Sequence, residues 1–190
     1  DDRTVKIWDV STGKCCQTLH GHTGWVLSVC YSPDGQILAS SSSDRTIRLW
    51  RAVTGECIKV LSGHTGAIQS TTFSPDGNTL ASSCDGQTAM LWDVSTGEAL
   101  RTARGYHDGV WSVVFSPDGK TIATGDNNQK VKLWDTSTGQ CRKALQGHTG
   151  WIRTVTFSPD GQTFASGCDD RTVKIWHTSN GQCCQTLEGH

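Results

Sequence analysis

A repeat of 42 residues runs through the whole chain without an insertion or a deletion. Its clearest markers are the tetrapeptide Ser-Pro-Asp-Gly and a tryptophan that recurs with the same spacing. The tetrapeptide begins at Ser32, Ser74, Ser116 and Ser158, and the tryptophans are Trp8, Trp50, Trp92, Trp134 and Trp176. A fixed period of this length is typical of proteins built from stacked copies of one small unit. The fold of the chain therefore depends on the fold of one unit and on how its copies pack.

Each unit contains four short segments of strand character separated by turn residues. In the first complete unit the segments are residues 26–31, 37–41, 46–50 and 57–61. They are rich in β-branched, aromatic and small apolar residues, as strands are. Pro33-Asp34-Gly35 and Thr54-Gly55 lie between segments and favour tight reversals of the chain. No segment has the spacing of an amphipathic helix. We therefore expect each unit to be an antiparallel sheet of four strands.

One such sheet of about 40 residues is too small to stand alone, because short chains bury a low fraction of their surface. Twisted four-stranded sheets that stack face to face around an axis form a β-propeller. Residues 1–20 supply only the third and fourth strands of a unit, which makes a half blade. The complete units are residues 22–61, 64–103, 106–145 and 148–187. The expected fold of residues 1–190 is all-β, with about four and a half blades in an incomplete ring.

The residues of the repeat resemble the WD40 repeat, also called the WD repeat. The likeness covers the entire chain and lies in Gly-His, Phe-Ser-Pro-Asp-Gly, Leu-Ala-Ser and Asp-Arg-Thr-Ile-Arg-Leu-Trp. Trp-Asp itself stands at Trp8-Asp9, Trp92-Asp93 and Trp134-Asp135, and becomes Trp50-Arg51 and Trp176-His177 in the other two units. The near-identity of the units is most similar to the long arrays of bacterial, especially cyanobacterial, signalling proteins.

Rings of this family commonly have seven blades, so the resemblance implies a segment of a seven-bladed or larger propeller. A split assembly is the other possibility. A dimer that closes at nine blades is a weaker alternative, because each junction would still hold a half blade of two strands.

The resemblance also implies a buried, hydrogen-bonded tetrad of His, Ser or Thr, Asp and Trp in each blade. The matching residues are His22, Ser40, Asp44 and Trp50 in the first complete unit, and His148, Ser166, Asp170 and Trp176 in the fourth. We interpret this set as structural, because it recurs at 42-residue intervals while a hydrolase needs its catalytic triad only once.

Two units depart from this pattern. Gly86 replaces the Asp of the tetrad in the second complete unit, where Asp85, one place earlier, is a candidate substitute. In the third unit Tyr106 takes the place of the His, His107 lies next to it, and Asn128 replaces the Asp. We expect these two blades to exchange their amide hydrogens faster than the blade that holds His148.

Composition excludes several function classes. The chain has 17 Lys and Arg against 18 Asp and Glu, and its pI of about 6.7 offers no basic surface for nucleic acid. Its apolar runs fall far short of the roughly 18 residues that span a bilayer, and residues 1–10 do not resemble a signal peptide. We therefore expect neither a nucleic-acid partner nor a membrane partner.

The nine cysteines indicate free thiols in a reducing compartment, because they are odd in number and most of them follow the repeat. Neighbouring cysteines such as Cys15 and Cys16 would point to opposite faces of a strand. No Cys-x-x-Cys, phosphate-binding loop or Gly-x-Ser-x-Gly elbow is present. We accordingly expect a cytoplasmic protein without a metal, a cofactor or catalytic residues.

The positions that differ between nearly identical units indicate where a partner binds. In WD40-like propellers, partners usually meet the face that carries the Gly-His loops and the turns before the third strands. The residues on that face that vary, or that suit binding hot spots, are Trp25, Leu27, Ser43, Gln69, Asp85, Trp111, Asn127, Trp151, Arg153 and Asp169. Exposed Trp and Arg are typical of hot spots. The alternative is that Trp25 and Trp151 pack between blades.

The sequence therefore predicts a non-catalytic protein-interaction scaffold, the sensor or platform part of a larger regulatory protein, with a protein or peptide ligand on the propeller face. Remaining blades from a parent chain are a further expected partner. One alternative is an enzyme with its site in the central channel, which would need converging carboxylates. Another is a structural array that serves assembly.

Overall fold

The computed structural model describes residues 2–104 and 109–189. Strands are the only regular secondary structure of these residues, and they form one sheet of two strands and four sheets of four. The two-stranded sheet, called the half-blade, consists of β1 (Val5–Trp8) and β2 (Cys15–Leu19). Blade 1 consists of β3 (Val26–Tyr31), β4 (Ile37–Ser42), β5 (Thr46–Arg51) and β6 (Cys57–Ser62).

The other three blades repeat this order. Blade 2 consists of β7 (Ile68–Phe73), β8 (Thr79–Cys84), β9 (Ala89–Asp93) and β10 (Ala99–Ala103). Blade 3 consists of β11 (Val110–Phe115), β12 (Thr121–Asp126), β13 (Val131–Asp135) and β14 (Cys141–Leu145). Blade 4 consists of β15 (Ile152–Phe157), β16 (Thr163–Cys168), β17 (Thr172–His177) and β18 (Cys183–Glu188).

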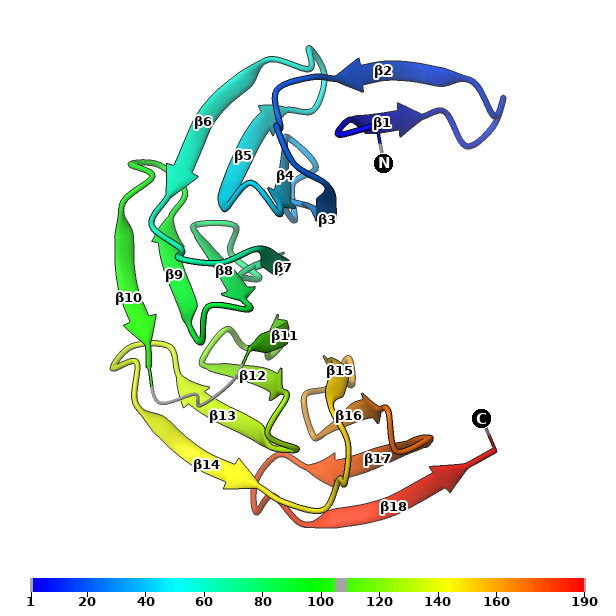
Figure 1. Cartoon of the computed structure of the whole chain (residues 1–190), viewed down its shortest axis with the longest axis vertical. Coiled ribbons are helices and arrows are strands. Elements are labelled where there is room, and N and C mark those ends of the chain that lie inside the picture. The colour runs from blue at the N-terminus through cyan, green and yellow to red at the C-terminus, as the bar shows by residue number, and fades with distance from the viewer. Residues whose placement is uncertain (1, 105–108, 190) are drawn as a thin grey trace.

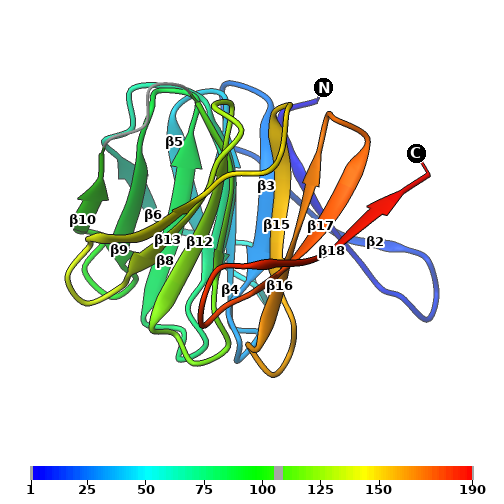
Figure 2. The same cartoon turned by 90° about the horizontal axis from the view of Figure 1, so that it is seen from below.

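The sheets stand side by side in an open arc. Each strand pairs antiparallel with its neighbour in sequence, so every blade is a simple meander. The first strand of each blade lies on the inner side of the arc and the fourth strand on the outer side (Figure 1). The view from below shows the sheets stacked next to one another (Figure 2). The predicted all-β, incomplete propeller is confirmed. Among the described residues, no helix has the length and apolarity needed to cross a bilayer.

The predicted turns owe their shape to a local set of hydrogen bonds. In the turn between β3 and β4, the Gly35 amide donates to the Ser32 carbonyl over 2.8 Å, and Gly35 has φ of 71°. The Ser32 hydroxyl donates to the Asp34 carboxylate, which also accepts from the Gln36 amide. Glycine adopts this left-handed conformation without the steric cost that a side chain brings. The same turn recurs in the other blades and fixes the register of the first two strands.

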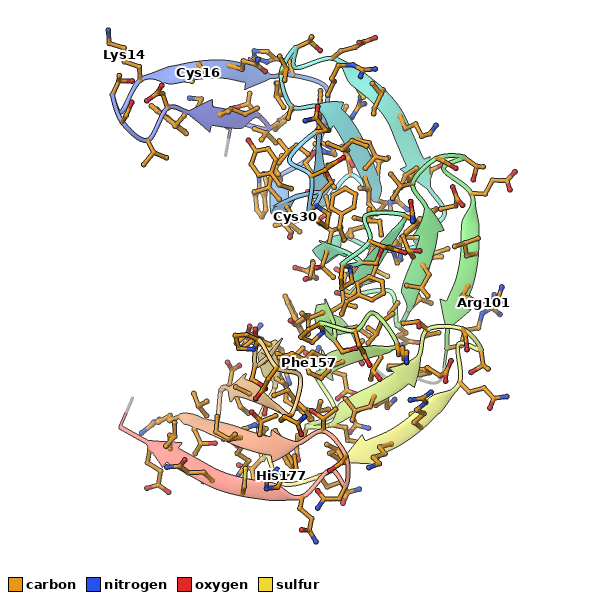
Figure 3. The ribbon with its side chains drawn as sticks, turned by 180° about the vertical axis from the view of Figure 1, so that it is seen from behind. Lys14, Cys16, Cys30, Arg101, Phe157 and His177 are labelled. Atoms are coloured by element: carbon orange, nitrogen blue, oxygen red, sulfur yellow. The ribbon has the colours of Figure 1, made fainter. Side chains whose placement is uncertain are left out.

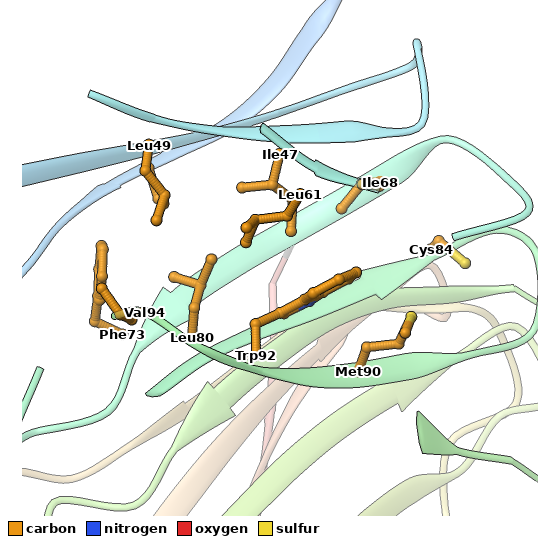
Figure 4. Close-up of a cluster of buried hydrophobic side chains, with 11 residues drawn as sticks. Ile47, Leu49, Leu61, Ile68, Phe73, Leu80, Cys84, Met90, Trp92 and Val94 are labelled. Carbon is orange, nitrogen blue, oxygen red and sulfur yellow. The ribbon is translucent and has the colours of Figure 1, made fainter. Parts of the chain in front are cut away.

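The apolar core lies between neighbouring blades. Between blades 1 and 2, Ile47, Leu49 and Leu61 pack against Leu80 and Trp92, all at most 2% exposed (Figure 4). Similar clusters lie at the other three junctions of the arc. Burying a side chain of this size contributes about 1.5–3 kcal/mol relative to leaving it exposed. Each sheet is therefore stable because its neighbours cover its faces.

The inner strands are also linked to one another by polar contacts. The Thr71 amide of β7 donates to the Ser28 hydroxyl of β3 over 3.3 Å, and the Val155 amide of β15 donates to the Ser112 hydroxyl of β11 over 3.1 Å. These bonds join consecutive blades on the concave side of the arc.

The two ends of the arc lack such cover in the described chain. Val29 of blade 1 is 52% exposed, whereas its equivalent Val113 in blade 3 is 4% exposed. Leu187 of blade 4 is 42% exposed, whereas its equivalent Leu61 is 2% exposed. The same residue type in the same place of the repeat is thus buried or exposed according to whether a neighbouring blade is present.

Candidate partner-binding site

The inner strand of every blade begins with a β-bulge, and the bulge sets the direction of one side chain. Pairing passes from Val110 to Ser112 in β11 and from Ile152 to Thr154 in β15, so Trp111 and Arg153 are the extra residues. Bulged residues are re-aimed relative to the regular pleat. The chain thereby places the side chains of Trp111 and Arg153 at the loop face, the edge of the blades where the inner strands begin.

Two turns bring polar partners to the same place. The turn that follows β12 carries Asn127, and the turn that follows β16 carries Asp169. Backbone hydrogen bonds tie the turns to the strand starts, because the Asp169 amide donates to the Trp151 carbonyl and the Asn127 amide to the Gly109 carbonyl. Five of the predicted residues therefore meet across blades 3 and 4. We call this group the aromatic patch: Trp111, Asn127, Trp151, Arg153 and Asp169.

The aromatic patch is built around the Arg153 guanidinium. Its central carbon lies 4.7 Å from the ring centroid of Trp111 and 4.8 Å from that of Trp151. The two indole rings are nearly parallel, at 15°, with centroids 6.1 Å apart. The Trp111 ring N–H donates to the Asn127 side-chain carbonyl. A cation placed this close to aromatic faces is attracted by the ring quadrupoles.

A carboxylate fixes the same guanidinium from the other side. Arg153 donates from Nε and Nη2 to the Asp169 carboxylate, at distances between 2.8 and 3.1 Å. The hydrogen bonds from Arg153 lower the pKa of Asp169, and those same bonds raise the pKa of Arg153. Paired charges and two ring contacts leave Arg153 with one favoured orientation. The aromatic patch is therefore a nearly neutral, pre-organised surface.

The patch is open to solvent. Trp151 is 45% exposed, and Trp25, at the equivalent place in blade 1, is 60% exposed. Trp151 also stacks on Trp111 of the neighbouring blade, and Trp25 lies next to the two-stranded half-blade, so the alternative in which these two tryptophans pack between blades stays a prediction.

The other five predicted residues lie on the loop face of blades 1 and 2. The Trp25 amide donates to the Ser43 hydroxyl over 2.8 Å, which holds the start of β3 to the turn before β5. Leu27, on the bulge of β3, is 38% exposed. Gln69 is half-buried on the equivalent bulge of β7, and Asp85 is exposed in the turn that follows β8. Within the described residues, no hydrogen bond or ring contact connects these five to the aromatic patch.

The predicted tetrads form continuous chains of hydrogen bonds in blades 1 and 4. In blade 1 the Trp50 indole donates to the Ser40 hydroxyl over 2.8 Å, and His22 Nε2 lies 2.8 Å from the same oxygen. His22 Nδ1 lies 2.8 Å from Asp44 Oδ2. Because a carboxylate only accepts, Nδ1 carries the proton and Nε2 accepts from Ser40. Blade 4 repeats this chain with distances of 2.7–2.8 Å.

The burial of these tetrads indicates that their role is structural and not catalytic. Ser40 and Ser166 are 0% exposed, so no substrate reaches their hydroxyls. Burial alone would raise the pKa of Asp44, but hydrogen bonds from Thr46, from His22 and from the Thr23 amide outweigh it and hold the pKa well below its usual range. The carboxylate is thus ionised and fully used as an acceptor. Leaving one of these buried groups without its partner would cost about 1–3 kcal/mol.

The departures in blades 2 and 3 have different consequences. In blade 2, His64 Nδ1 lies 3.2 Å from the Thr88 hydroxyl, and burial lowers the pKa of His64 to about 4. Asp85 makes no contact with His64, so the suggestion that it replaces the missing carboxylate is wrong. In blade 3 the Trp134 indole donates to the Thr124 hydroxyl over 3.0 Å. Tyr106 and His107 lie outside the described residues.

Side chains of the types that bind metal ions lie close together at one place in the described chain. One ligand atom each from His148, Cys168 and Asp170 lies within 4.8 Å of the others. His148 and Asp170 are already bonded to each other, and burial raises the pKa of the Cys168 thiol, which favours its protonated form. All nine cysteine thiols are free. They are also dispersed, since Cys30 lies on the inner side of the arc and Cys16 on the half-blade (Figure 3).

Sequence reasoning found the positions of the aromatic patch but not its internal contacts. The pairing of Arg153 with Asp169 depends on the bulge in β15, which the residue pattern does not mark. The available indication was that Arg153 and Asp169, which carry opposite charges, both stand at loop-face positions of the same unit.

Comparison with known families agrees with this architecture. A family model described as the first β-propeller of IFT122 matches residues 1–128, which is more than half of the chain. A second model, described as the WD domain, G-beta repeat, matches residues 139–177. The chain belongs to the WD40-repeat family of β-propellers. The bulges, turns and tetrads described above are therefore those of WD40 blades.

Individual WD40 proteins are similar to this chain over one repeat. Nuclear distribution protein PAC1 of Arthroderma otae is 58% identical over 40 residues, which is 21% of this chain and 9% of the relative. The Lissencephaly-1 homolog of Heterostelium pallidum is 49% identical over 39 residues, 20% of this chain and 9% of the relative. The matches thus span about a tenth of the relatives' length. These relatives are eukaryotic, so the likeness to bacterial arrays stays a prediction.

Proposed function

We propose that this WD40 segment is a non-catalytic platform for protein–protein contacts, and that its principal contact surface is the aromatic patch on blades 3 and 4. The partner is a protein or a peptide that lies across the loop face. The segment serves as the sensor or platform part of a larger regulatory protein in the cytoplasm. Each repeat unit, such as residues 22–61, supplies one blade of it.

The observation that supports this proposal most is the fixed geometry of Arg153. Its guanidinium is bonded to Asp169 and lies against the rings of Trp111 and Trp151, so binding costs little side-chain entropy. Tryptophan and arginine are the residue types most enriched at interface hot spots. Because the charge of Arg153 is already matched, the complementary surface on the partner is aromatic or aliphatic with a polar rim.

The rival proposal of an enzyme in the central channel lacks its residues. The four inner strands β3, β7, β11 and β15 line the concave side of the arc, and they contain no Asp, Glu or His. The converging carboxylates expected of a site in the central channel are therefore not present on these four described strands. The proposal of a purely structural array has no specific support in the contacts of the described chain.

The test compares what the protein retains from an extract of the cells that make it. The immobilised wild type is compared with Trp151→Ala and Arg153→Ala, and retained proteins are quantified by mass spectrometry. Loss of a hot-spot side chain costs about 2 kcal/mol or more, so we expect at least a ~10-fold loss of the specific partner with Trp151→Ala.

The matched control is Tyr31→Ala. Tyr31 is an aromatic residue that is 50% exposed at the other end of β3, away from the loop face. This variant should retain the partner as the wild type does. Equal retention by all variants would show that the aromatic patch is not the contact surface.

A further inference from the structure

The tetrad carboxylate of blades 1 and 4 is a hub for four hydrogen bonds. In blade 1, Asp44 Oδ2 accepts from His22 Nδ1 at 2.8 Å and from the Thr23 amide at 2.9 Å. Asp44 Oδ1 accepts from the amide and the hydroxyl of Thr46, at 2.9 and 2.6 Å. In blade 4, Asp170 receives the same four bonds from His148, Thr149 and Thr172. The donors therefore surround the position of one carboxylate.

Blade 2 keeps all of these donors but has no carboxylate at their centre. His64, Thr65 and Thr88 stand at the equivalent places, and Gly86 stands where the Asp would be. His64 Nδ1 keeps the contact with the Thr88 hydroxyl, at 3.2 Å, that blades 1 and 4 also make at 3.5 and 3.3 Å, but it lacks the carboxylate oxygen that lies 2.8 Å from Nδ1 in those blades. The amides of Thr65 and Thr88 donate to no other residue among those the structure describes.

Three of these four residues, all except His64, line an open depression of about 460 Å³. Its walls include Thr65, Gly86 and Thr88, and Arg104 lies on its rim. Arg104 is exposed and contributes a positive charge near the donors, whereas Asp85, also exposed, is the opposing charge in the adjoining turn. The depression lies on blade 2, apart from the aromatic patch of blades 3 and 4.

The state of His64 suits an acceptor ligand. Ser82 accepts from the Trp92 indole at 2.7 Å and lies 2.6 Å from His64 Nε2. Among the described residues, His64 Nε2 is the acceptor within reach of the buried Ser82 hydroxyl, so the hydroxyl donates to Nε2 and the proton of the neutral ring is on Nδ1. That N–H faces the side where blades 1 and 4 hold their carboxylate.

We propose that this depression of blade 2 binds a carboxylate ligand, which takes the place that the Asp44 side chain occupies in blade 1. One ligand oxygen accepts from His64 Nδ1 and the Thr65 amide. The other oxygen accepts from the amide and hydroxyl of Thr88, and Arg104 adds a favourable charge. Binding requires the exposed Thr65 side chain to turn away from Gly86, which its hydroxyl now approaches. The carboxylate can come from a free small acid or from an acidic side chain of a partner.

The test is a formate titration of the ¹⁵N-labelled protein, followed by NMR and matched in ionic strength with sodium chloride. We expect saturable downfield proton shifts of the Thr65 and Thr88 amides. The equivalent Thr23 and Thr149 amides provide an internal control, because Asp44 and Asp170 already bind them and they should not move. Absence of a saturable shift at Thr65 and Thr88 would overturn the proposal. Equal shifts with chloride would overturn the assignment to a carboxylate.

Two variants complete the test. Gly86 is outside the left-handed region of φ, so the backbone angle admits Gly86→Asp, which supplies its own carboxylate once the Thr65 side chain and the Gly66 amide, the latter 2.9 Å from the added Cβ, move aside. In this variant the chemical shifts of the Thr65 and Thr88 amide protons should lie near the values that the wild type reaches at formate saturation. Added formate should not change them further. Arg104→Gln should raise the half-saturating formate concentration about two- to fivefold, as expected for an exposed charge. Formate shifts that persist unchanged in Gly86→Asp would place the ligand elsewhere and contradict the proposal.

Acetylated, amidated aspartate as a second probe separates the two sources of the carboxylate. Shifts with formate alone indicate a site for small free acids, whereas shifts with both probes show that an acidic side chain also fits. This proposal does not depend on the aromatic patch, so an experiment can contradict one of the two proposals without contradicting the other.

Discussion

At the scale of single residues, equivalent positions of the repeat act as internal controls for one another. His22 and His64 occupy the same place, yet only His22 faces a carboxylate. Burial without that carboxylate lowers the pKa of His64 from 6.5 to about 4. The unfolded chain therefore takes up a proton at a higher pH than the folded chain does. Stability from this site is complete above about pH 6.5 and is lost as the pH falls toward about 4.

Gly86→Asp should flatten this pH dependence. An acceptor at His64 Nδ1 favours the protonated ring, which raises the pKa of His64 toward that of an exposed histidine. The wild type should lose up to about 2 kcal/mol at this site between about pH 6.5 and pH 5, and the variant should lose much less. Urea unfolding at several pH values measures both. An identical loss of stability in the two proteins would show that burial of His64 does not control this range.

The residue pattern predicted which side chains form the tetrads, because each type recurs at a fixed place in the repeat. It did not predict the conformation of Arg45 or Gln87, which have φ of 69° and 68° in the turns before β5 and β9. A left-handed residue there would ordinarily be expected to be glycine. The same conformation occurs with and without the tetrad carboxylate, so the tight turn between the paired strands imposes it, and that constraint exists only in the folded blade.

At the scale of elements, the junction between blades 2 and 3 is less well packed than its neighbours. Ala89 and Ala103 of blade 2 stand where blade 1 has Ile47 and Leu61. A cavity of about 20 Å³ lies among Ala89, Ala103 and the Trp134 ring of blade 3. Fewer carbon atoms meet across this junction, so blades 2 and 3 contribute less to each other's stability.

Ala103→Leu should stabilise the protein by restoring the packing of the other junctions. Leu61 and Leu145, its equivalents, contact the glycine in the outer turn of the next blade, at Gly97 and Gly181. Filling a cavity of this kind typically gains about 0.5–2 kcal/mol. Chemical denaturation measures the change. The reverse change, Leu61→Ala, should cost about 2–5 kcal/mol; a destabilising Ala103→Leu would mean that the junction cannot accept the added volume.

The expectation that the blades with incomplete tetrads exchange their amide hydrogens faster stays a prediction. The structure shows that blade 1 is a better reference for this comparison than blade 4. Blade 4, which holds His148, has Leu187 exposed at its uncovered face. Blade 1 has a neighbouring sheet on each side, although the half-blade leaves Val29 of the inner strand exposed, and its tetrad is complete. Slower exchange in β4 of blade 1 than in β8 of blade 2 is therefore the cleaner expected result. The sequence could not reveal this difference because the two complete tetrads are chemically the same.

At the scale of the whole molecule, the open arc leaves identical residues in different surroundings. Val113→Ala removes atoms from a buried site and should cost about 2 kcal/mol, whereas Val29→Ala changes a side chain that is 52% exposed and should cost less than about 0.5 kcal/mol. Equilibrium unfolding of the two variants tests the open arrangement directly. Equal costs would mean that something covers Val29 in solution.

The overall architecture was largely predictable because one 42-residue unit, copied with a fixed register, leaves few ways to bury its sheet faces. The location of the candidate site on the loop face was predictable for a related reason, since Trp111 and Arg153 stand at places where other units carry different residues. The contact of Trp111 and Arg153 with each other and with Asp169 could not be predicted, because it forms only when blades 3 and 4 are in their final positions. That arrangement belongs to the assembled arc and is not visible within a single unit.

We expect a partner to dock on the aromatic patch, and hydrogen exchange of the complex with the captured partner tests this most directly. We predict slower exchange in residues 109–113 and 151–154 on binding, and no change around Tyr31 at the opposite end of β3. Slowing confined to the strand ends near Tyr31, with residues 109–113 and 151–154 unaffected, would contradict the account.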